Sequence, residues 1–272
     1  MIEFDLRKHL EECGLRCLHY DEQMAWGHEI LNKKFNKKNW EKFEILAKKV
    51  FNSTKKPNER LAFYDLIAEK NVEYVLHSHK FNAILQSGLK VSELIDVLQP
   101  ISILDFGCNT GHLASWYARR NQKINVTGVD ISYHSIQAAK NLSKKFDLKN
   151  CNFIEGNYQK KIDKKFDIVV DTQSIFEAPD RKKILRWISN SILSENGSFI
   201  SIPQTGNKED FINFVGEITS AGLYISSLEF ISFEDFDKKG CYPVICTKNS
   251  KIDFKYDLDL FWTELYNYFS GY

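Results

Sequence analysis

The hydrophobic positions divide the chain into two parts with different periodicities. Up to about residue 98, apolar side chains recur at helical spacing, as in Phe43, Leu46, Ala47 and Val50, and no strand pattern interrupts them. From Pro100 onward, short apolar runs alternate with helical stretches. The pattern therefore predicts an all-helical N-terminal cap over residues 1–98, followed by an α/β domain over residues 99–250.

The second part predicts a doubly wound, mostly parallel sheet of seven strands. The strand-like runs are 101–105, 125–130, 152–155, 166–171, 198–202, 224–231 and 243–247. Helical patterns at 111–120, 132–146 and 180–193, and another beyond Pro203, separate several of these runs, which indicates right-handed crossovers and parallel pairing. The loop 234–240 is too short for a crossover helix, so we expect the last strand to be antiparallel.

The C-terminal segment 251–272 reads as one amphipathic helix. Its apolar stripe comprises Leu258, Phe261, Trp262, Leu265, Tyr266 and Phe269. Such a stripe must be covered, and packing against the body of the protein is the simplest cover. A homodimer contact through this helix is the second interpretation.

Composition and charge exclude several classes of protein. Lys and Arg number 37 against 36 Asp and Glu, so the net charge is +1 and no basic field favours a nucleic-acid partner. The six cysteines are scattered without a Cys-x-x-Cys pair, which is typical of a reduced cytoplasmic setting. Cys13, Cys17 and His19 are an incomplete ligand set, so no metal is expected. No apolar stretch approaches the ~20 residues of a membrane helix, so we expect no membrane partner.

Residues 101–111 carry the most informative motif. They read Ile-Ser-Ile-Leu-Asp-Phe-Gly-Cys-Asn-Thr-Gly: an apolar strand, a carboxylate at its end and a glycine-bounded turn into a helix. Gly107 and Gly111 are expected to let the backbone approach a ligand where a Cβ would collide. The dinucleotide-binding pattern fails because no glycine stands at 109 or 112, and the Gly-Lys-Ser/Thr of a P-loop is absent. A tight turn without a ligand remains the plain alternative.

This stretch resembles the first motif of class I S-adenosylmethionine-dependent methyltransferases, Asp/Glu-x-Gly-x-Gly-x-Gly. Three of its four fixed positions match, and Asn109 replaces the middle glycine; asparagine tolerates a left-handed backbone. The resemblance implies S-adenosyl-L-methionine as the cofactor. It also implies cofactor contacts from Asp105, Gly107, Cys108, Asn109 and Gly111.

Further along the chain, two strand ends extend the resemblance. Asp130 ends the second strand, where it would accept two hydrogen bonds from the ribose, with Ile131 against the adenine; capping of the next helix is the alternative role. Asn157 stands where relatives commonly have an adenine-binding Asp, and Tyr158 either covers the adenine or packs in the core.

The fourth strand and its exit, 166–180, match the family again at Phe166-Asp-Ile-Val-Val and Pro179-Asp180. The resemblance places Asp171, Thr172 and Gln173 beside the methyl donor. Candidates for a general base are Asp171, Glu177 and His28, a cap histidine that could equally pack in the core. Candidates for binding the substrate are Gln173 and, in the cap, Tyr20 and Trp26.

The predicted function is transfer of a methyl group to an oxygen or nitrogen atom of a small molecule. The near-neutral charge and the 14% aromatic residues favour such an acceptor. Two alternatives stay open: methylation of a protein or peptide side chain, docked on the C-terminal stripe or the loop 231–243, and a non-catalytic subunit that binds the cofactor.

Overall fold

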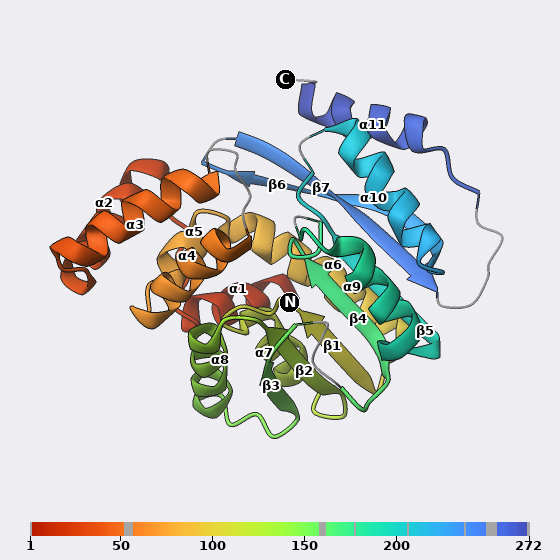
Figure 1. Cartoon of the computed structure of the whole chain (residues 1–272), viewed down its shortest axis with the longest axis horizontal. Helices are drawn as coiled ribbons and strands as arrows, with labels where there is room; N and C mark the ends of the chain where they lie inside the picture. Colours follow the sequence, from red (N-terminus) through yellow and green to blue (C-terminus); the bar gives the residue numbers. More distant parts are fainter. Residues whose placement is uncertain are drawn as a thin grey trace.

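The protein is built around one seven-stranded sheet. The computed structural model describes residues 2–51, 57–157, 162–176, 178–205, 207–236, 238–248 and 255–270. The strands are β1 (Ser102–Phe106), β2 (Asn125–Asp130), β3 (Cys151–Glu155), β4 (Phe166–Thr172), β5 (Leu193–Ile202), β6 (Tyr224–Asp235) and β7 (Lys238–Lys248) (Figure 1).

The sheet has the strand order β3-β2-β1-β4-β5-β7-β6. Strands β1 to β5 pair in parallel, and β7 pairs antiparallel with both β5 and β6. This confirms the predicted doubly wound sheet with an antiparallel last strand. The strand order reverses between β1 and β4, and ligands of such sheets bind at the carboxyl ends of the strands at this point.

Helices cover both faces of the sheet. One hydrophobic core lies between the sheet and α1 (Ile2–Glu12), α6 (Phe81–Leu98), α7 (His112–Arg120) and α8 (Tyr133–Lys145). The other lies under α9 (Arg181–Trp187), the π-helical turn η1 (Ile188–Ile192), α10 (Lys208–Ser220) and α11 (Leu258–Ser270). Burial of apolar surface on both faces explains why the parallel strands read as continuous hydrophobic runs.

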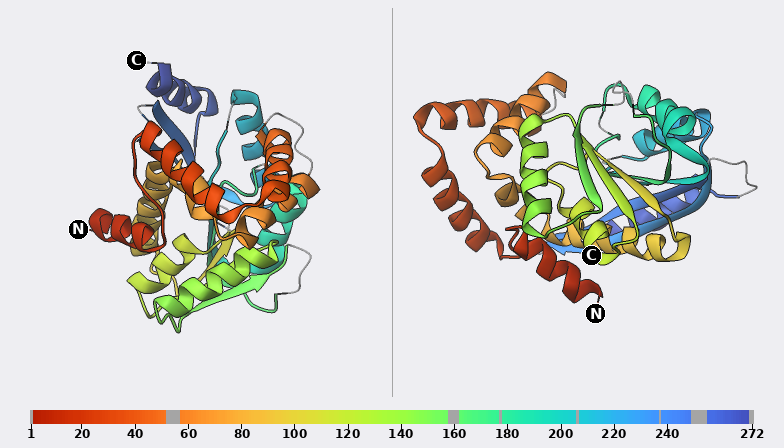
Figure 2. Two further views of the ribbon diagram at one scale, coloured as in Figure 1. Left: turned by 90° about the vertical axis from the view of Figure 1, so that its left-hand side faces the viewer. Right: turned by 90° about the horizontal axis from the view of Figure 1, so that it is seen from below.

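The cap is smaller than the helical third of the sequence. Only α2 (Tyr20–Lys34), α3 (Lys37–Phe51), α4 (Pro57–Glu69) and α5 (Glu73–Ser78) share a separate core, in which Phe63, Leu66 and Ile67 are buried. Seen from below, α2 and α3 lie outside the sheet layers (Figure 2). Helices α1 and α6 instead pack on the sheet with the apolar side chains that their periodicity marks, so the cap proper spans α2 to α5.

Two predicted boundaries differ from the structure. The helix expected over 180–193 is observed over 181–192, with its last five residues forming the π-helical turn η1. Strand β5 then begins at Leu193, which pairs with Phe166, before a bulge that delays the regular ladder until Ser198. Strand β6 ends at Asp235 and β7 begins at Lys238, so the two strands include most of the loop predicted over 231–243. Cross-strand pairs at the hairpin tip therefore outweigh the polar character of that segment.

The C-terminal helix packs on the body, as predicted. Phe261 and Leu265 of α11 are buried, and the Phe261 and Trp262 rings lie 5.6 and 5.7 Å from the ring of Phe211 in α10. Among the described residues, no helix combines the length and the apolar character needed to cross a membrane.

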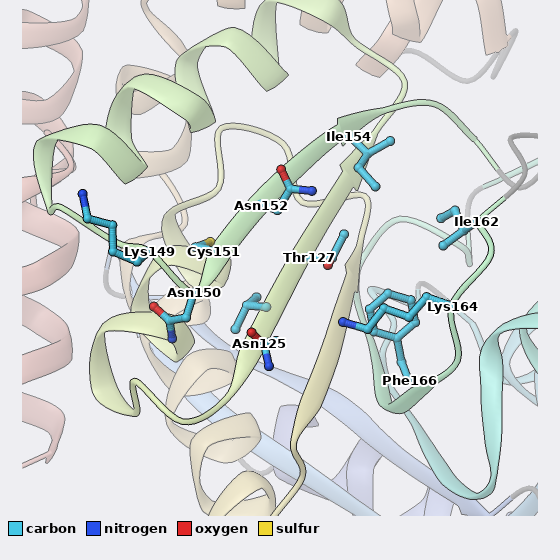
Figure 3. A pocket seen from close by; sticks show the side chains of 11 residues that line it. Asn125, Thr127, Lys149, Asn150, Cys151, Asn152, Ile154, Ile162, Lys164 and Phe166 are labelled. Carbon is cyan, nitrogen blue, oxygen red and sulfur yellow. The ribbon is translucent and has the colours of Figure 1, made fainter.

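A shallow hollow opens on the face of β2 and β3 (Figure 3). The connection from β3 to β4 supplies no helix among its described residues, and Ile162 and Lys164 of this connection line the hollow. Its lining at Asn125, Asn150 and Asn152 is polar and begins at the amino ends of the strands. The hollow is therefore separate from the carboxyl edge.

Glu73 in the cap provides a test of the pH dependence of stability. Its side chain is 2% exposed, one carboxyl oxygen has no described partner, and burial raises its pKa from 4.5 to about 7. The stabilisation by neutral Glu73 is therefore complete below pH ~4.5 and is lost as the pH rises through about 7. We therefore compare the free energies of unfolding of Glu73→Gln and the wild type. Between pH 4 and pH 8, this difference should change in favour of the variant by up to about 3 kcal/mol.

The measurement is denaturant unfolding of the full chain at several pH values. Glu11→Gln, on the exposed face of α1, is the control and should follow the wild type at every pH. A constant difference between Glu73→Gln and the wild type across this range would contradict the burial argument.

Candidate functional site

The turn after β1 has the backbone conformation that its sequence predicts. Gly107, Asn109 and Gly111 have φ values of 74°, 49° and 78°, so the prediction that asparagine fits the left-handed middle position is confirmed. The N–H groups of Gly107 and Cys108 both donate to the carbonyl of Val129, at 2.8 and 3.0 Å. The turn is thereby fastened to the neighbouring strand β2.

Gly107 and Gly111 were expected to leave space for a ligand, but the structure gives a different reason for them. A Cβ on Gly107 would lie 2.4 Å from Ser174, and one on Gly111 would lie 2.7 Å from the ring of Phe153. Protein side chains, rather than an approaching ligand, thus fill the space beside each glycine. Positive φ and close internal packing together require glycine here.

Asp130 connects the turn to the next helix. One carboxyl oxygen accepts from the Asn109 N–H and the other from the Ser132 N–H, each at 2.9 Å. Ser132 itself caps α8 by accepting from the Ser135 N–H at 3.1 Å, so Asp130 is not needed for that role. Ile131, beside Asp130, is 49% exposed at the carboxyl edge and leaves apolar surface there.

The other predicted adenine contacts follow β3. The Gly156 N–H donates to the Asp130 carbonyl at 2.8 Å, which brings the end of β3 alongside Asp130. Asn157 comes next and is half-buried, whereas Tyr158 lies outside the described residues.

Three carboxyl groups gather beneath this edge, at the ends of β1, β4 and β2. Asp105 is 2% exposed, and burial, with the charges of Asp171 and Asp130, raises its pKa to about 7. A hydrogen bond from the Ala114 backbone acts in the opposite sense. Burial likewise raises the pKa of Asp130 and Asp171. Such a concentration of acidic groups in a low-dielectric environment favours a positively charged ligand.

Both carboxyl oxygens of Asp171 accept hydrogen bonds from neighbouring groups of the protein. One carboxyl oxygen accepts from the Ser174 hydroxyl and N–H and from the Ile175 N–H, at 2.6, 3.0 and 3.0 Å. The other accepts from the Ser201 hydroxyl at 2.8 Å. The side chain is fully buried, and its hydrogen bonds hold the exit of β4 in place; its roles as base and cofactor contact stay predictions.

The exit of β4 is shaped by Asp171 and by Gln173. Thr172 ends the strand half-buried, and Gln173 follows with φ of 69°, an uncommon conformation for a residue other than glycine. The Gln173 N–H donates to the Ile202 carbonyl at 3.1 Å, which keeps the tips of β4 and β5 together. The Gln173 side chain therefore stands at the edge where the resemblance places the substrate.

The cap contacts the site through residues that the sequence analysis did not single out. His77 of α5 lies with Nε2 3.4 Å from Asn109 Nδ2, and its ring is 4.9 Å from that of His112. Asp65 of α4 accepts a hydrogen bond from the Ser132 hydroxyl at 2.9 Å. Neither residue lies in a recognisable motif, so only the fold brings them to the residues that flank Asp130.

The cap residues predicted to act in catalysis or binding lie elsewhere. His28 is exposed on α2 and stacks on Trp40 at 6.5 Å, and Trp26 packs near Tyr74 at 5.8 Å. The structure therefore brings neither to the strand tips. Tyr20 reaches the β6–β7 hairpin, where its ring lies 5.5 Å from Phe236. Glu177 lies outside the described residues.

Two unpaired polar atoms indicate whether the residues at this edge fit S-adenosylmethionine. Asn109 Oδ1 and His77 Nδ1 are buried and have no hydrogen-bond partner among the described residues. Burial without a partner is costly, so such atoms indicate a missing polar partner. The ammonium group of S-adenosylmethionine is a suitable donor, and the residues fit the group. No cluster of His, Cys, Asp and Glu in the described part of the chain could hold a metal ion.

Comparison with known proteins agrees with this geometry. Residues 99–217 match a family model described as "Methyltransferase domain". The chain is 27% identical over 152 residues to the release factor glutamine methyltransferase of Fusobacterium nucleatum, which covers 52% of this chain and 39% of that protein. It is 27% identical over 136 residues to a probable cobalt-precorrin-6B C(15)-methyltransferase of Methanocaldococcus jannaschii, covering 46% and 73%. The alignment with the release factor enzyme thus spans about two fifths of its length.

Solved structures show the same fold at low identity. The methyltransferase domain of bacterial CtHen1 superposes with a TM-score of 0.51 at 15% identity and covers 61% of this chain and 100% of that one. A putative O-methyltransferase from Nostoc punctiforme gives a TM-score of 0.50 at 15% identity, covering 68% and 60%. These likenesses concern the arrangement of the sheet and its helices.

Proposed function

We propose that the chain is a class I S-adenosylmethionine-dependent methyltransferase that transfers a methyl group to an oxygen or nitrogen atom of a small molecule. The match of residues 99–217 to a model of a methyltransferase domain supports the proposal. The observation that carries the proposal is the carboxyl edge of the sheet. There Asp130 and Asn109 stand above buried acidic side chains, beside the exit of β4. S-adenosylmethionine supplies a methyl group on a positively charged sulfur, which a nucleophile can displace in line.

The chain's own residues would bind and orient the reactants. The carboxyl group of Asp130 accepts from the backbone N–H groups of Asn109, Ile131 and Ser132. Its two oxygens can accept more bonds than these three, so it can also accept from a ribose hydroxyl. Asn109 Oδ1 can accept from the ammonium group. The acidic side chains around Asp105 favour the cationic cofactor, and the cap contacts the site through His77 at Asn109 and through Asp65 at Ser132.

Alignment is expected to contribute more than proton transfer. Asp171 is hydrogen-bonded within its turn and His28 stacks on Trp40, so we assign neither as the base. Glu177 remains the base proposed from the sequence. An acceptor that is already nucleophilic needs mainly to be held in line with the methyl group.

The names of the relatives point to a second candidate function, methylation of a protein side chain. The release factor enzymes act, by their names, on glutamine in a protein. What favours a small acceptor here is the cap. Helix α5 contacts the cofactor turn at Asn109, α4 contacts Ser132 near Asp130, and Tyr20 approaches the hairpin tip. These contacts narrow the access that a large partner would need.

Transfer of a labelled methyl group separates these candidates. We expect the full chain, given methyl-labelled S-adenosylmethionine and a cell extract split by ultrafiltration, to label a compound in the filtrate. Label in the retained protein would favour a protein acceptor, and binding without label in either fraction would favour a non-catalytic subunit. Heat-inactivated protein is the control.

Asp130 should determine cofactor affinity. S-adenosylhomocysteine at 100 times its Kd should stabilise the wild type by about 2.7 kcal/mol. We expect Asp130→Ala to lose this stabilisation, because the ribose hydroxyls lose their acceptors, and Asp130→Asn, which keeps one oxygen, to retain part of it. The measurement is thermal unfolding with and without ligand.

Asp147→Ala is the matched control for Asp130, because Asp147 is an exposed aspartate paired with Lys149 in the loop before β3. Its shift should equal that of the wild type. An undiminished shift in Asp130→Ala would remove the ribose contact from the proposal.

Cofactor binding should also depend on pH through Asp105. Because its pKa is about 7 in the free protein, its negative charge forms only as the pH rises through that value. A bound sulfonium favours the ionised carboxyl, so affinity should rise several-fold between pH 6 and pH 8, by at most about tenfold per pH unit. Titration calorimetry should show this for S-adenosylmethionine, and less for S-adenosylhomocysteine, which lacks the sulfonium charge. In Asp105→Asn the affinity for S-adenosylmethionine should change little with pH. If it changes as much as in the wild type, Asp105 does not cause the pH dependence.

A further inference from the structure

One residue of the cap, His77 in α5, lies directly against the turn after β1. Its Nε2 is 3.4 Å from Asn109 Nδ2, and its ring packs edge-on against the ring of His112 at 4.9 Å. Asn109 belongs to the turn, and His112 begins the helix that follows it. The two contacts therefore hold the His77 ring beside the proposed cofactor site.

The contact with Asn109 determines which ring nitrogen of His77 carries the proton. An amide NH2 group only donates, so His77 Nε2 accepts from Asn109 Nδ2. Burial lowers the pKa of His77 from 6.5 to about 4, so the ring is neutral near pH 7 and its one proton is on Nδ1. His77 Nδ1 is thus a donor, and it is buried without a hydrogen-bond partner among the described residues.

Asn109 has the complementary group. Its Oδ1 is an acceptor, and it is likewise buried with no partner in the described part of the chain. One donor and one acceptor without partners therefore belong to two side chains that contact each other. Reversing the Asn109 carboxamide exchanges the roles of the two side chains, but one donor and one acceptor still remain. An α-amino acid has the matching pair, because its carboxylate accepts hydrogen bonds and its ammonium group donates them.

We infer that His77 and Asn109 together hold the amino-acid end of S-adenosylmethionine, with His77 donating to the carboxylate and Asn109 accepting from the ammonium group. The inference rests on the proposed function, and it makes His77 the residue through which the cap selects ligands that carry the amino acid. Both protein atoms are buried, so these ionic groups would be shielded from water. Charge-assisted hydrogen bonds are strong under such conditions.

Two ligands that differ at this end provide the probe. S-adenosylhomocysteine carries the adenosine, the sulfur and the amino acid. In 5′-methylthioadenosine a methyl group replaces the amino-acid chain on the sulfur. Neither ligand has the sulfonium charge, so a difference in their affinities reports on the amino-acid end.

Two substitutions separate the ring nitrogens of His77. Asparagine carries its amide group on Cγ, the atom that bears Nδ1 in histidine, so His77→Asn keeps a polar group in the position of Nδ1. Glutamine carries its amide one carbon further out. His77→Gln therefore keeps a polar group near the position of Nε2, where the contact with Asn109 is made, and none at Nδ1.

The test is titration calorimetry of the full chain with each ligand. We expect the wild type to bind S-adenosylhomocysteine at least about tenfold more tightly than 5′-methylthioadenosine, because hydrogen bonds to charged groups are worth this much. His77→Gln should weaken S-adenosylhomocysteine by about tenfold or more and leave 5′-methylthioadenosine within about twofold of the wild type. His77→Asn should keep most of the affinity for S-adenosylhomocysteine.

His28→Gln is the matched control, because it makes the same substitution at an exposed histidine of α2. It should bind both ligands as the wild type does. Equal affinities of the wild type for the two ligands would overturn the inference without any variant. A loss in His77→Gln that is equal for both ligands, or that His77→Asn repeats in full, would overturn it as well. Failure of both ligands to bind the wild type would instead refute the proposed function, so the two failures are distinguishable.

Discussion

The carboxyl edge of this sheet is organised by the need to accommodate three acidic side chains, of which two are fully buried and Asp130 is half-buried. Burial raises the pKa of Asp105, Asp130 and Asp171, which means that the fold holds each charge at a cost. The structure offsets this cost with backbone and hydroxyl donors. Those donors are the N–H groups of the turn after β1, of the first turn of α8 and of the exit of β4. The same hydrogen bonds therefore solvate the acids and set the shape of the site.

The cap helices contact the same residues that hold Asp130 in place. Asp65 reaches the Ser132 hydroxyl, and His77 reaches Asn109, so two cap helices rest on the residues that flank Asp130. The cap has its own hydrophobic core and contacts the site through polar groups. Tyr74 packs against both this core and the core on the sheet, so apolar packing joins the cap to the body as well. The cap thus adds polar contacts at Asn109 and Ser132 to that packing.

The sequence predicted the sheet better than it predicted the site. Strand periodicity, short connections and the turn after β1 gave the order of elements, because parallel strands buried on both faces leave a strong local pattern. The extent of the cap and the long β6–β7 hairpin were missed, since tertiary pairing decides them. At the site, the conformation of Asn109 was foreseen from its backbone preference. The roles of Asp65 and His77 were not, because their partners lie more than 30 positions away in sequence.

The charge at this edge would act differently on the two forms of the proposed cofactor. Acidic side chains lie beneath the cofactor turn, where they would attract the positively charged sulfur of the methyl donor. Once the methyl group has left, the sulfur is neutral, and the acidic side chains would hold the product less strongly than they hold the donor. Binding of the donor and release of the product would then follow from one electrostatic pattern.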